Sequence, residues 1–222
     1  MRAWPLYLRL QNESAYGDGV ATCGVDDQHA VIAAAYFDRL AREVDCRNGL
    51  IIGPGGPGEV RALSPHMPGQ VFALTAHPPE VEAIRAECGD VLTELGDLHE
   101  LPYQSEHMGL VYASNVLEHA IAPLAAVMEI RRALRPGGVA YLVMPGFDGE
   151  HAGRDPLHLH CLDRRVWNEL LRKVGLYTAS LLDVPGRVDP SCTYVHYRCV
   201  AGEIQEPYHT LMRELMTLRA SP

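Results

Sequence analysis

Four short apolar runs punctuate the chain between residues 50 and 143. They are Leu50–Ile52, Val71–Leu74, Leu110–Ala113 and Val139–Val143, and three of the four directly follow a glycine. An uninterrupted apolar run of this length is typical of a strand buried on both faces of a parallel sheet. Val91-Leu92 predicts one more short strand, between the second and third of these runs.

The segments between the runs carry apolar residues three and four positions apart, which predicts amphipathic helices. A helix from Asp26-Asp27 would bury one face, made of Ala30, Ala33, Ala34, Phe37, Leu40, Ala41 and Val44. Further helices are expected from Glu59, from Pro78-Pro79, and over residues 124–134 before Pro136-Gly137-Gly138. Alternating strands and helices predict an α/β domain whose parallel sheet is covered on both faces.

The pattern changes after Pro145. Residues 146–161 form a loop rich in Gly, His and Asp, and Asp163 can cap a helix that ends at Gly175. Leu176–Val184 and Thr193–Ala201 predict two more strands, followed by a final helix over about Pro207–Leu218. No repeat or linker divides the chain, so one domain is expected over residues 1–222.

Composition narrows the classes of partner. Nineteen basic against 28 acidic residues give a formal charge of −9, which disfavours nucleic acid and anionic membrane as partners. No apolar run approaches the roughly 20 residues of a membrane span, and the N-terminus lacks the long apolar segment of a signal peptide. The six cysteines are scattered without a C-x-x-C pair, which indicates reduced thiols and a cytoplasmic protein. We expect either a monomer or a homodimer.

The first apolar run leads into Gly53-Pro54-Gly55-Gly56-Pro57-Gly58, just before the helix expected from Glu59. A strand, a glycine turn and a helix make the first half of a nucleotide-binding βαβ unit, where glycines let a cofactor approach bare backbone. The spacing Gly53-x-Gly55-x-x-Gly58 also fits the dinucleotide fingerprint. A surface turn between two core elements has the same composition, so other motifs must decide.

Two features disfavour a dinucleotide. The end of the second expected strand, where an acidic residue would hold ribose hydroxyls, carries Thr75. Pro54 and Pro57 also remove two amide donors from the turn where a pyrophosphate would need them. These features weaken the prediction of a nicotinamide cofactor without excluding it.

Three later motifs flank the remaining strands: Gly96-Asp97-Leu98-His99-Glu100-Leu101-Pro102, then Ser114-Asn115-Val116-Leu117-Glu118-His119, then Leu134-Arg135-Pro136-Gly137-Gly138. With the glycine turn, they resemble the class I S-adenosylmethionine-dependent methyltransferases, in particular the small group of methyltransferase type 11-like domains. The resemblance covers roughly residues 48–145, with a weaker similarity at Asp155–His160. It implies a Rossmann-like, seven-stranded, mostly parallel sheet with helices on both faces and the last strand antiparallel.

The resemblance also implies roles for individual residues. Gly53, Gly55 and Gly58 would line the methionine part of S-adenosyl-L-methionine. Asp97 would accept a hydrogen bond from the adenine amino group, and Leu98 would supply a backbone amide. Ser114 and Asn115 would face the transferred methyl, and residues 26–145 would form the cofactor-binding core.

Thr75 departs from the family pattern, in which a carboxylate at this position grips both ribose hydroxyls. A hydroxyl makes one such hydrogen bond, not a charge-assisted pair. Weak cofactor binding is therefore one expectation, and an introduced Asp or Glu at position 75 is expected to strengthen it.

The candidate catalytic residues are histidines, because an imidazole titrates near neutral pH and a hydroxyl acceptor needs a base. They are His119, His158 and His160, and each has a structural alternative as a helix-start or loop anchor. A metal site at Asp155, His158, His160 and Cys161 is the weaker interpretation, so no metal is expected. Trp167 could wall an acceptor pocket, but its spacing with Leu170 and Leu171 favours the core.

These observations predict a methyltransferase acting on a small molecule at oxygen or nitrogen. Residues 1–25 would form a lid around Tyr16–Gly19, and residues 146–222 would supply the acceptor loop, Phe147–His160, and the C-terminal elements. Two alternatives stay open: an NAD(P)-dependent reductase, and a methyltransferase-like domain that binds partners without catalysis. The acceptor cannot be named, because acceptor loops vary independently of the fold.

Overall fold

The computed structural model describes residues 27–40, 48–67, 69–146, 158–186, 193–206, 208–211 and 213–214. The expected lid at residues 1–25 and most of the expected acceptor loop lie outside these residues. So does part of the final helix, of which 208–211 and 213–214 are helical. None of the helices in the described ranges has the length and hydropathy that a membrane span requires.

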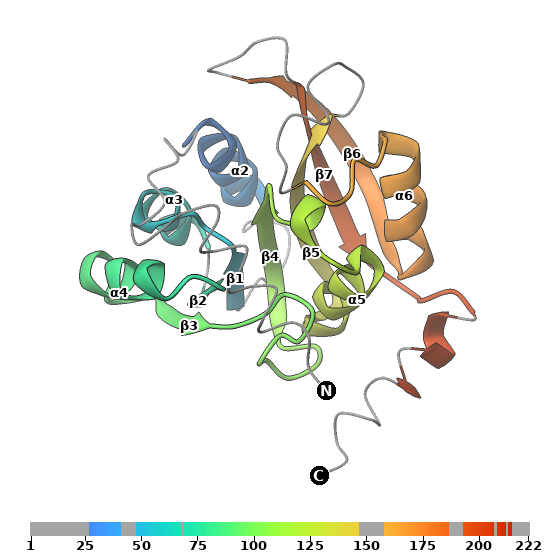
Figure 1. Ribbon diagram of the computed structural model, residues 1–222, viewed down its shortest axis with the longest axis horizontal. Coiled ribbons are helices and arrows are strands. Elements are labelled where there is room, and N and C mark those ends of the chain that lie inside the picture. The colour runs from blue at the N-terminus through green and yellow to red at the C-terminus, as the bar shows by residue number, and fades with distance from the viewer. Residues whose placement is uncertain are drawn as a thin grey trace.

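The strands form one seven-stranded sheet of order β3-β2-β1-β4-β5-β7-β6 (Figure 1). Their bounds are β1 Asn48–Ile52, β2 Gln70–Thr75, β3 Leu92–Leu95, β4 Met108–Ser114, β5 Leu134–Gly146, β6 Leu176–Pro185 and β7 Thr193–Ala201. The pairs among β1 to β5 are parallel, and β7 runs antiparallel to both β5 and β6. The expected mostly parallel sheet with an antiparallel last strand is confirmed.

Helices cover both faces of the sheet, as the alternating pattern predicts. They are α2 Asp27–Leu40, α3 Pro57–Leu63, α4 Pro78–Glu87, α5 Pro123–Ala133 and α6 Arg164–Lys173, with short 3₁₀ helices η1 Ser64–His66 and η2 Leu117–His119. Ile51 packs into a core with α2, α3 and α4, while its neighbours Leu50 and Ile52 pack into a second core with α5 and α6. This alternation places the two groups of helices on opposite faces.

Several element boundaries differ from the sequence-based expectation, among them those of α3, β3 and β5. Helix α3 begins at Pro57, not Glu59, because a proline at the first helical position gives up an N–H that has no partner there. Strand β3 extends to Leu95, beyond Val91-Leu92. Strand β5 begins at Leu134 and includes the Pro-Gly-Gly segment, with a register irregularity opposite Met108 and Leu110.

A buried ion pair on α5 fixes the loop that follows β3. Arg132 Nη2 lies 2.8 Å from Glu129 Oε2, and both side chains are almost fully buried. The pair also holds the Leu101 peptide, since Glu129 accepts from its N–H at 3.0 Å and Arg132 donates to its carbonyl at 3.0 Å. Arg132 donates at 2.7 Å to the carbonyl of Tyr103 as well. The Asp97–Tyr103 loop is therefore anchored to a helix.

Replacing Arg132 by alanine is expected to lower the free energy of unfolding by about 3–5 kcal/mol, because it leaves the Glu129 carboxylate buried without its counter-charge. Arg172, which pairs with Glu169 at the same spacing on the exposed face of α6, is the matched control. Urea unfolding of both alanine variants measures the difference. Equal small losses in the two variants would contradict a structural role for the buried pair.

Candidate active site

The turn after β1 requires glycine for two separate physical reasons. Gly53 and Gly55 have φ of 61° and 62°, and Gly56 has φ of 140°, all in the region that side chains other than glycine rarely adopt. At Gly53 a Cβ would also lie 2.7 Å from Val116 Cγ2, while at Gly56 it would meet nothing within 4 Å. The backbone N–H of Gly53 donates to Leu74 O at 2.8 Å, which ties the turn to β2. The turn therefore presents backbone to open space.

A pocket of about 120 Å³ lies beside this turn, where four parallel strands end. Its walls come from the segments after β1, β2, β3 and β4, which are neighbours in the sheet. The lining residues are Ile52, Gly53, Gly55, Leu74, Thr75, Ala76, His77, Glu80, Gly96, Asp97, Leu98, His99, Asn115, Val116, His119 and Ala120. The carboxyl ends of parallel strands are where open α/β sheets bind ligands.

The structure brings together most of the candidate cofactor-binding residues and leaves two outside. Gly53, Gly55, Thr75, Asp97, Leu98 and Asn115 all line the pocket. Gly58 does not, because it lies inside the first turn of α3. Ser114 is buried at the end of β4 and is also absent from the lining. Of the candidate catalytic histidines, His119 lines the pocket, whereas His158 and His160 do not.

Asp97 is held by His99, a residue that no sequence pattern marked as part of the site. The Oδ1 atom of Asp97 accepts from the backbone N–H of His99 at 2.8 Å and lies 2.7 Å from its ring Nδ1. Nε2 of the same ring accepts from the Ala122 N–H at 3.3 Å, so Nδ1 carries the proton and donates to Asp97. Two donors from one residue fix the carboxylate against the pocket wall.

Thr75 has a buried carboxylate beside it. Glu80, in the first turn of α4, accepts a hydrogen bond from Thr75 Oγ1 at 2.6 Å and also lines the pocket. Burial raises the pKa of Glu80, while the Thr75 hydrogen bond and the neighbouring His77 lower it. The only sequence signal was an acidic residue after Pro78-Pro79, which by itself reads as an ordinary first-turn residue.

Asn115 occupies a backbone position that few residues tolerate. Its φ is 50°, in the left-handed region where asparagine is several-fold enriched among non-glycine residues. Its N–H donates to Val143 O at 2.9 Å, which holds the end of β4 against β5. Asn115 therefore turns the chain out of the sheet directly at the pocket wall.

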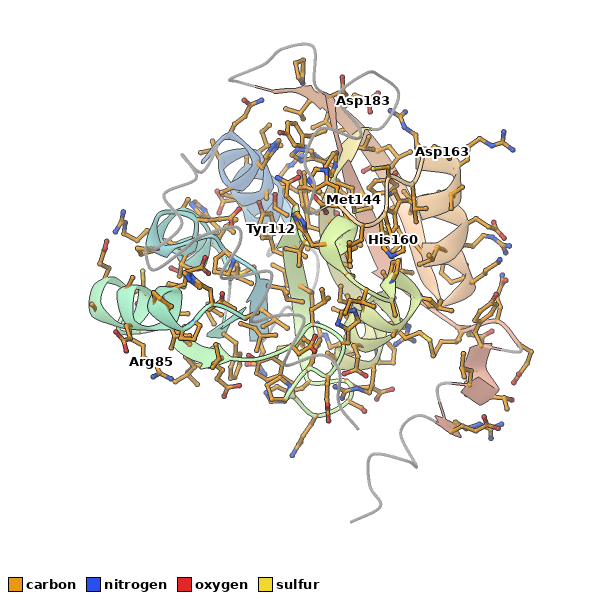
Figure 2. All side chains as sticks on the ribbon, in the orientation of Figure 1. Arg85, Tyr112, Met144, His160, Asp163 and Asp183 are labelled. Carbon is orange, nitrogen blue, oxygen red and sulfur yellow. The ribbon has the colours of Figure 1, made fainter. Side chains whose placement is uncertain are left out.

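The three candidate histidines have different surroundings. The rings of His119 and His158 meet edge to face with centroids 4.9 Å apart. His160 Nε2 instead lies 3.3 Å from the carbonyl of Ile121, on the side of the molecule where α5 and α6 lie (Figure 2). The backbone N–H groups of residues 159 and 160 both donate to Glu118 O, at 2.9 and 3.1 Å. The segment with His158 and His160 is thus anchored to η2.

The geometry gathers a different set of metal-ligand residues from the one weighed in the sequence. Ligand atoms of Glu118, His119 and His158 all lie within 4.8 Å of one another, and Glu118 is fully buried. Asp155 lies outside the described residues, and Cys161 is exposed. Two imidazoles and a carboxylate are a donor set that suits divalent metals. Each of these three residues also makes other interactions, so they serve the fold as well.

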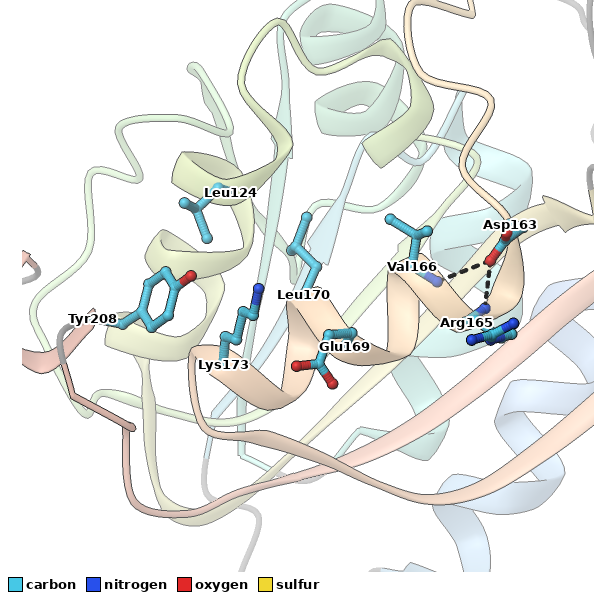
Figure 3. Close-up of a pocket in the computed structure, with 8 residues that line it drawn as sticks. All are labelled: Leu124, Asp163, Arg165, Val166, Glu169, Leu170, Lys173 and Tyr208. Carbon is cyan, nitrogen blue, oxygen red and sulfur yellow. Dashed lines mark hydrogen bonds between the residues drawn. The ribbon is translucent and has the colours of Figure 1, made fainter.

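A second, larger hollow of about 720 Å³ lies along the outer face of α6 (Figure 3). Its walls include Leu124, Val166, Leu170 and Tyr208, and the amino group of Lys173 lies 5.8 Å from the Tyr208 ring centroid. None of the candidate site residues lines it. Trp167, on the opposite side of α6, is buried in the core, as its helical spacing favours.

Residues 50–142 match the model of a family described as a methyltransferase domain. An uncharacterized protein in transposon TN4556 of Streptomyces fradiae is 40% identical over 58 residues, which are 26% of this chain. This chain matches only 17% of the length of that relative.

Solved structures share the fold at low identity. Burkholderia thailandensis 1,6-didemethyltoxoflavin-N1-methyltransferase, solved with 1,6-didemethyltoxoflavin and S-adenosylhomocysteine, is 19% identical with a TM-score of 0.71, over 89% of this chain and 88% of that one. The CurJ carbon methyltransferase is 16% identical with a TM-score of 0.63, over 88% and 58%.

The [4+2]-cyclase SpnF is 18% identical with a TM-score of 0.63, over 78% of this chain and 82% of that one. A cyclase among these neighbours means that the fold alone does not define the reaction. Residues 50–142 thus match a methyltransferase domain, and the fold of the chain is similar to that of solved S-adenosylmethionine-dependent methyltransferases.

Proposed function

We propose that this protein binds S-adenosyl-L-methionine in the pocket beside the glycine turn and transfers its methyl group to a small molecule at oxygen or nitrogen. One observation carries the proposal: the glycine turn, Asp97 and Asn115 line a single pocket across the ends of neighbouring parallel strands. The family match and a neighbour solved with S-adenosylhomocysteine support the cofactor.

The residues of the pocket fit the parts of this cofactor. The turn at Gly53 and Gly55 would offer bare backbone to the methionine part. Asp97, oriented by His99, would offer a carboxylate oxygen to the adenine amino group, and Leu98 would supply a backbone amide. When bound, S-adenosylmethionine supplies a methyl group already activated on a sulfonium, so positioning is most of what the protein must add.

A hydroxyl or amine acceptor must also lose a proton. His119 is the candidate histidine on the pocket wall, so it is the residue that we propose as the general base. His158, in ring contact with it, would position it, and His160 would anchor the loop through Ile121. This assignment selects His119, at the end of η2, from the three candidate histidines.

Calorimetric titration with S-adenosylhomocysteine, NAD(H) and NADP(H) side by side tests the proposal. We expect S-adenosylhomocysteine to bind and neither NAD(H) nor NADP(H) to bind detectably. Tighter binding of NAD(H) or NADP(H) would favour the reductase instead. Binding of none of the three would favour a domain that has kept the fold for contacts with a partner.

Replacing Asp97 by alanine is expected to weaken S-adenosylhomocysteine binding by about 1.5–3 kcal/mol, the worth of a hydrogen bond to a charged group. Glu100, in the same loop, provides a control as Glu100→Ala, since it is absent from the pocket lining. Calorimetry on both variants measures the loss. An unchanged affinity for Asp97→Ala would remove this residue from the adenine site.

A further inference from the structure

The end of β2 carries no carboxylate of its own, but the carboxylate of Glu80 on α4 lies beside it. Thr75 stands where a carboxylate was expected, yet the Glu80 carboxylate lies on the same pocket wall with its residue only 3% exposed. A buried carboxylate is costly unless it is hydrogen-bonded. The Glu80 carboxylate extends from α4 to the end of β2, where it accepts a hydrogen bond from Thr75. The acidic group at this site therefore comes from the helix and not from the strand.

Hydrogen bonds from the strand end orient this carboxylate. The backbone N–H of His77 donates to Thr75 Oγ1 at 3.1 Å, and Thr75 Oγ1 donates to Glu80 Oε2 at 2.6 Å. The Thr75 hydroxyl accepts the His77 N–H through an oxygen lone pair and donates its single proton to Glu80. Glu80 Oε1 lies on the other side, 3.7 Å from His77 Nδ1. Thr75 thus acts as a positioning residue for Glu80.

The start of α4 explains why the side chain turns toward the pocket. Pro78 and Pro79 form the first two helical positions, so the helix can begin immediately after the strand. Side chains on a helix tilt toward its N-terminus, which carries Glu80 back over His77 and Thr75. The positive end of the helix dipole also favours a carboxylate in this first turn.

The order of the strands indicates which part of the ligand meets Glu80. Strand β2 lies between β3, which leads to Asp97, and β1, which leads to Gly53. If adenine lies at Asp97 and the methionine part at the glycine turn, the ribose between them lies over the end of β2. We infer that Glu80, held by Thr75, is the carboxylate that accepts hydrogen bonds from the ribose hydroxyls of S-adenosylmethionine. This inference rests on the proposed function.

The arrangement reverses one sequence-based expectation. An aspartate at position 75 would place a second carboxylate against Glu80, where like charges at this distance disfavour each other. Thr75→Asp alone is therefore expected to weaken S-adenosylhomocysteine binding. The double variant Thr75→Asp/Glu80→Ala returns a single carboxylate to the strand end, and it is expected to bind more tightly than Thr75→Asp alone.

The test compares two ligands on three proteins by calorimetry. The ligands are S-adenosylhomocysteine and its 2′,3′-dideoxy analogue, which lacks both ribose hydroxyls. The proteins are the wild type, Glu80→Gln, and the control Glu82→Gln, whose position is exposed on the same helix. Glutamine keeps an oxygen that can accept from Thr75, so the pocket wall is retained.

Glu80→Gln is expected to weaken S-adenosylhomocysteine binding about 10- to 100-fold, the range for a lost hydrogen bond to a charged group, and to leave the dideoxy analogue nearly unaffected. Equal weakening of both ligands, or no weakening relative to Glu82→Gln, would overturn the inference while leaving the proposed function intact. Failure of the wild type to bind S-adenosylhomocysteine would instead overturn the proposed function. Should Glu80→Gln not fold, the wild type alone decides: it must bind S-adenosylhomocysteine at least 10-fold more tightly than the dideoxy analogue.

Discussion

Replacing His119 by alanine is expected to lower the turnover number by about 10²- to 10⁴-fold, the range typical of a lost general base. His119 is the candidate histidine that lines the pocket, and the contact with the His158 ring at 4.9 Å holds its imidazole in place. The affinity for S-adenosylhomocysteine is expected to stay nearly constant, because the base acts on the acceptor. The measurement is release of S-adenosylhomocysteine with a panel of small phenols, carboxylic acids and amines.

The matched control for this prediction is His160→Ala. His160 belongs to the same group of candidates but hydrogen-bonds to Ile121 O and is absent from the pocket lining. Its replacement is expected to lower stability more than turnover. A large loss of turnover in His160→Ala, with wild-type turnover in His119→Ala, would instead place the base in the segment before α6.

Acidification from pH 6.5 toward pH 3 is expected to reduce the free energy of unfolding by up to about 4–5 kcal/mol through one buried histidine, at 1.36 kcal/mol per unit of pKa shift. His196, on β7, has no solvent exposure, and burial first, then the charges of His29 and Arg198, lower its pKa from 6.5 to about 3. Its neighbours are His29 Nδ1 on α2 at 2.9 Å and the Tyr141 hydroxyl on β5 at 2.7 Å. Between pH 6.5 and pH 3, His196 is therefore protonated in the unfolded chain and neutral in the folded chain, and stability falls as the pH is lowered.

Urea unfolding between pH 7.5 and pH 4 measures this effect. The variant His196→Gln is expected to show a flatter dependence on pH than the wild type, although it starts from a lower stability. His107, an exposed histidine before β4, provides the control, and His107→Gln is expected to keep the wild-type slope. An unchanged slope in His196→Gln would show that other groups cause the acid sensitivity.

The central strands of the sheet were predictable from sequence because they are buried on both faces. Runs such as Leu110–Ala113 and Val139–Val143 contain no polar residue and lie near the middle of the sheet. The beginning of β5 was not predictable in the same way. Pro136 and the glycines after it read as a break after α5, yet they lie within the strand where its register against β4 is irregular.

The site was predictable where a residue follows a strand end directly, as Gly53, Asp97 and Asn115 do. Such residues lie at the carboxyl edge of the sheet, and their placement does not depend on where the helices begin or pack. Glu80 and His99 were missed because their roles depend on where their side chains turn. Glu80 reaches Thr75 only because α4 begins with two prolines, and no local pattern in the sequence shows that contact.

The buried pair on α5 has a consequence for the dynamics of the pocket. Arg132 and Glu129 bind both polar groups of the Leu101 peptide, four residues after Asp97. Any local opening of this loop must break both hydrogen bonds and leave the buried ion pair without its backbone partners, so the Leu101 amide should be among the slowest to exchange with deuterium. The adenine side of the pocket is then formed before the ligand arrives, and binding there costs little conformational entropy.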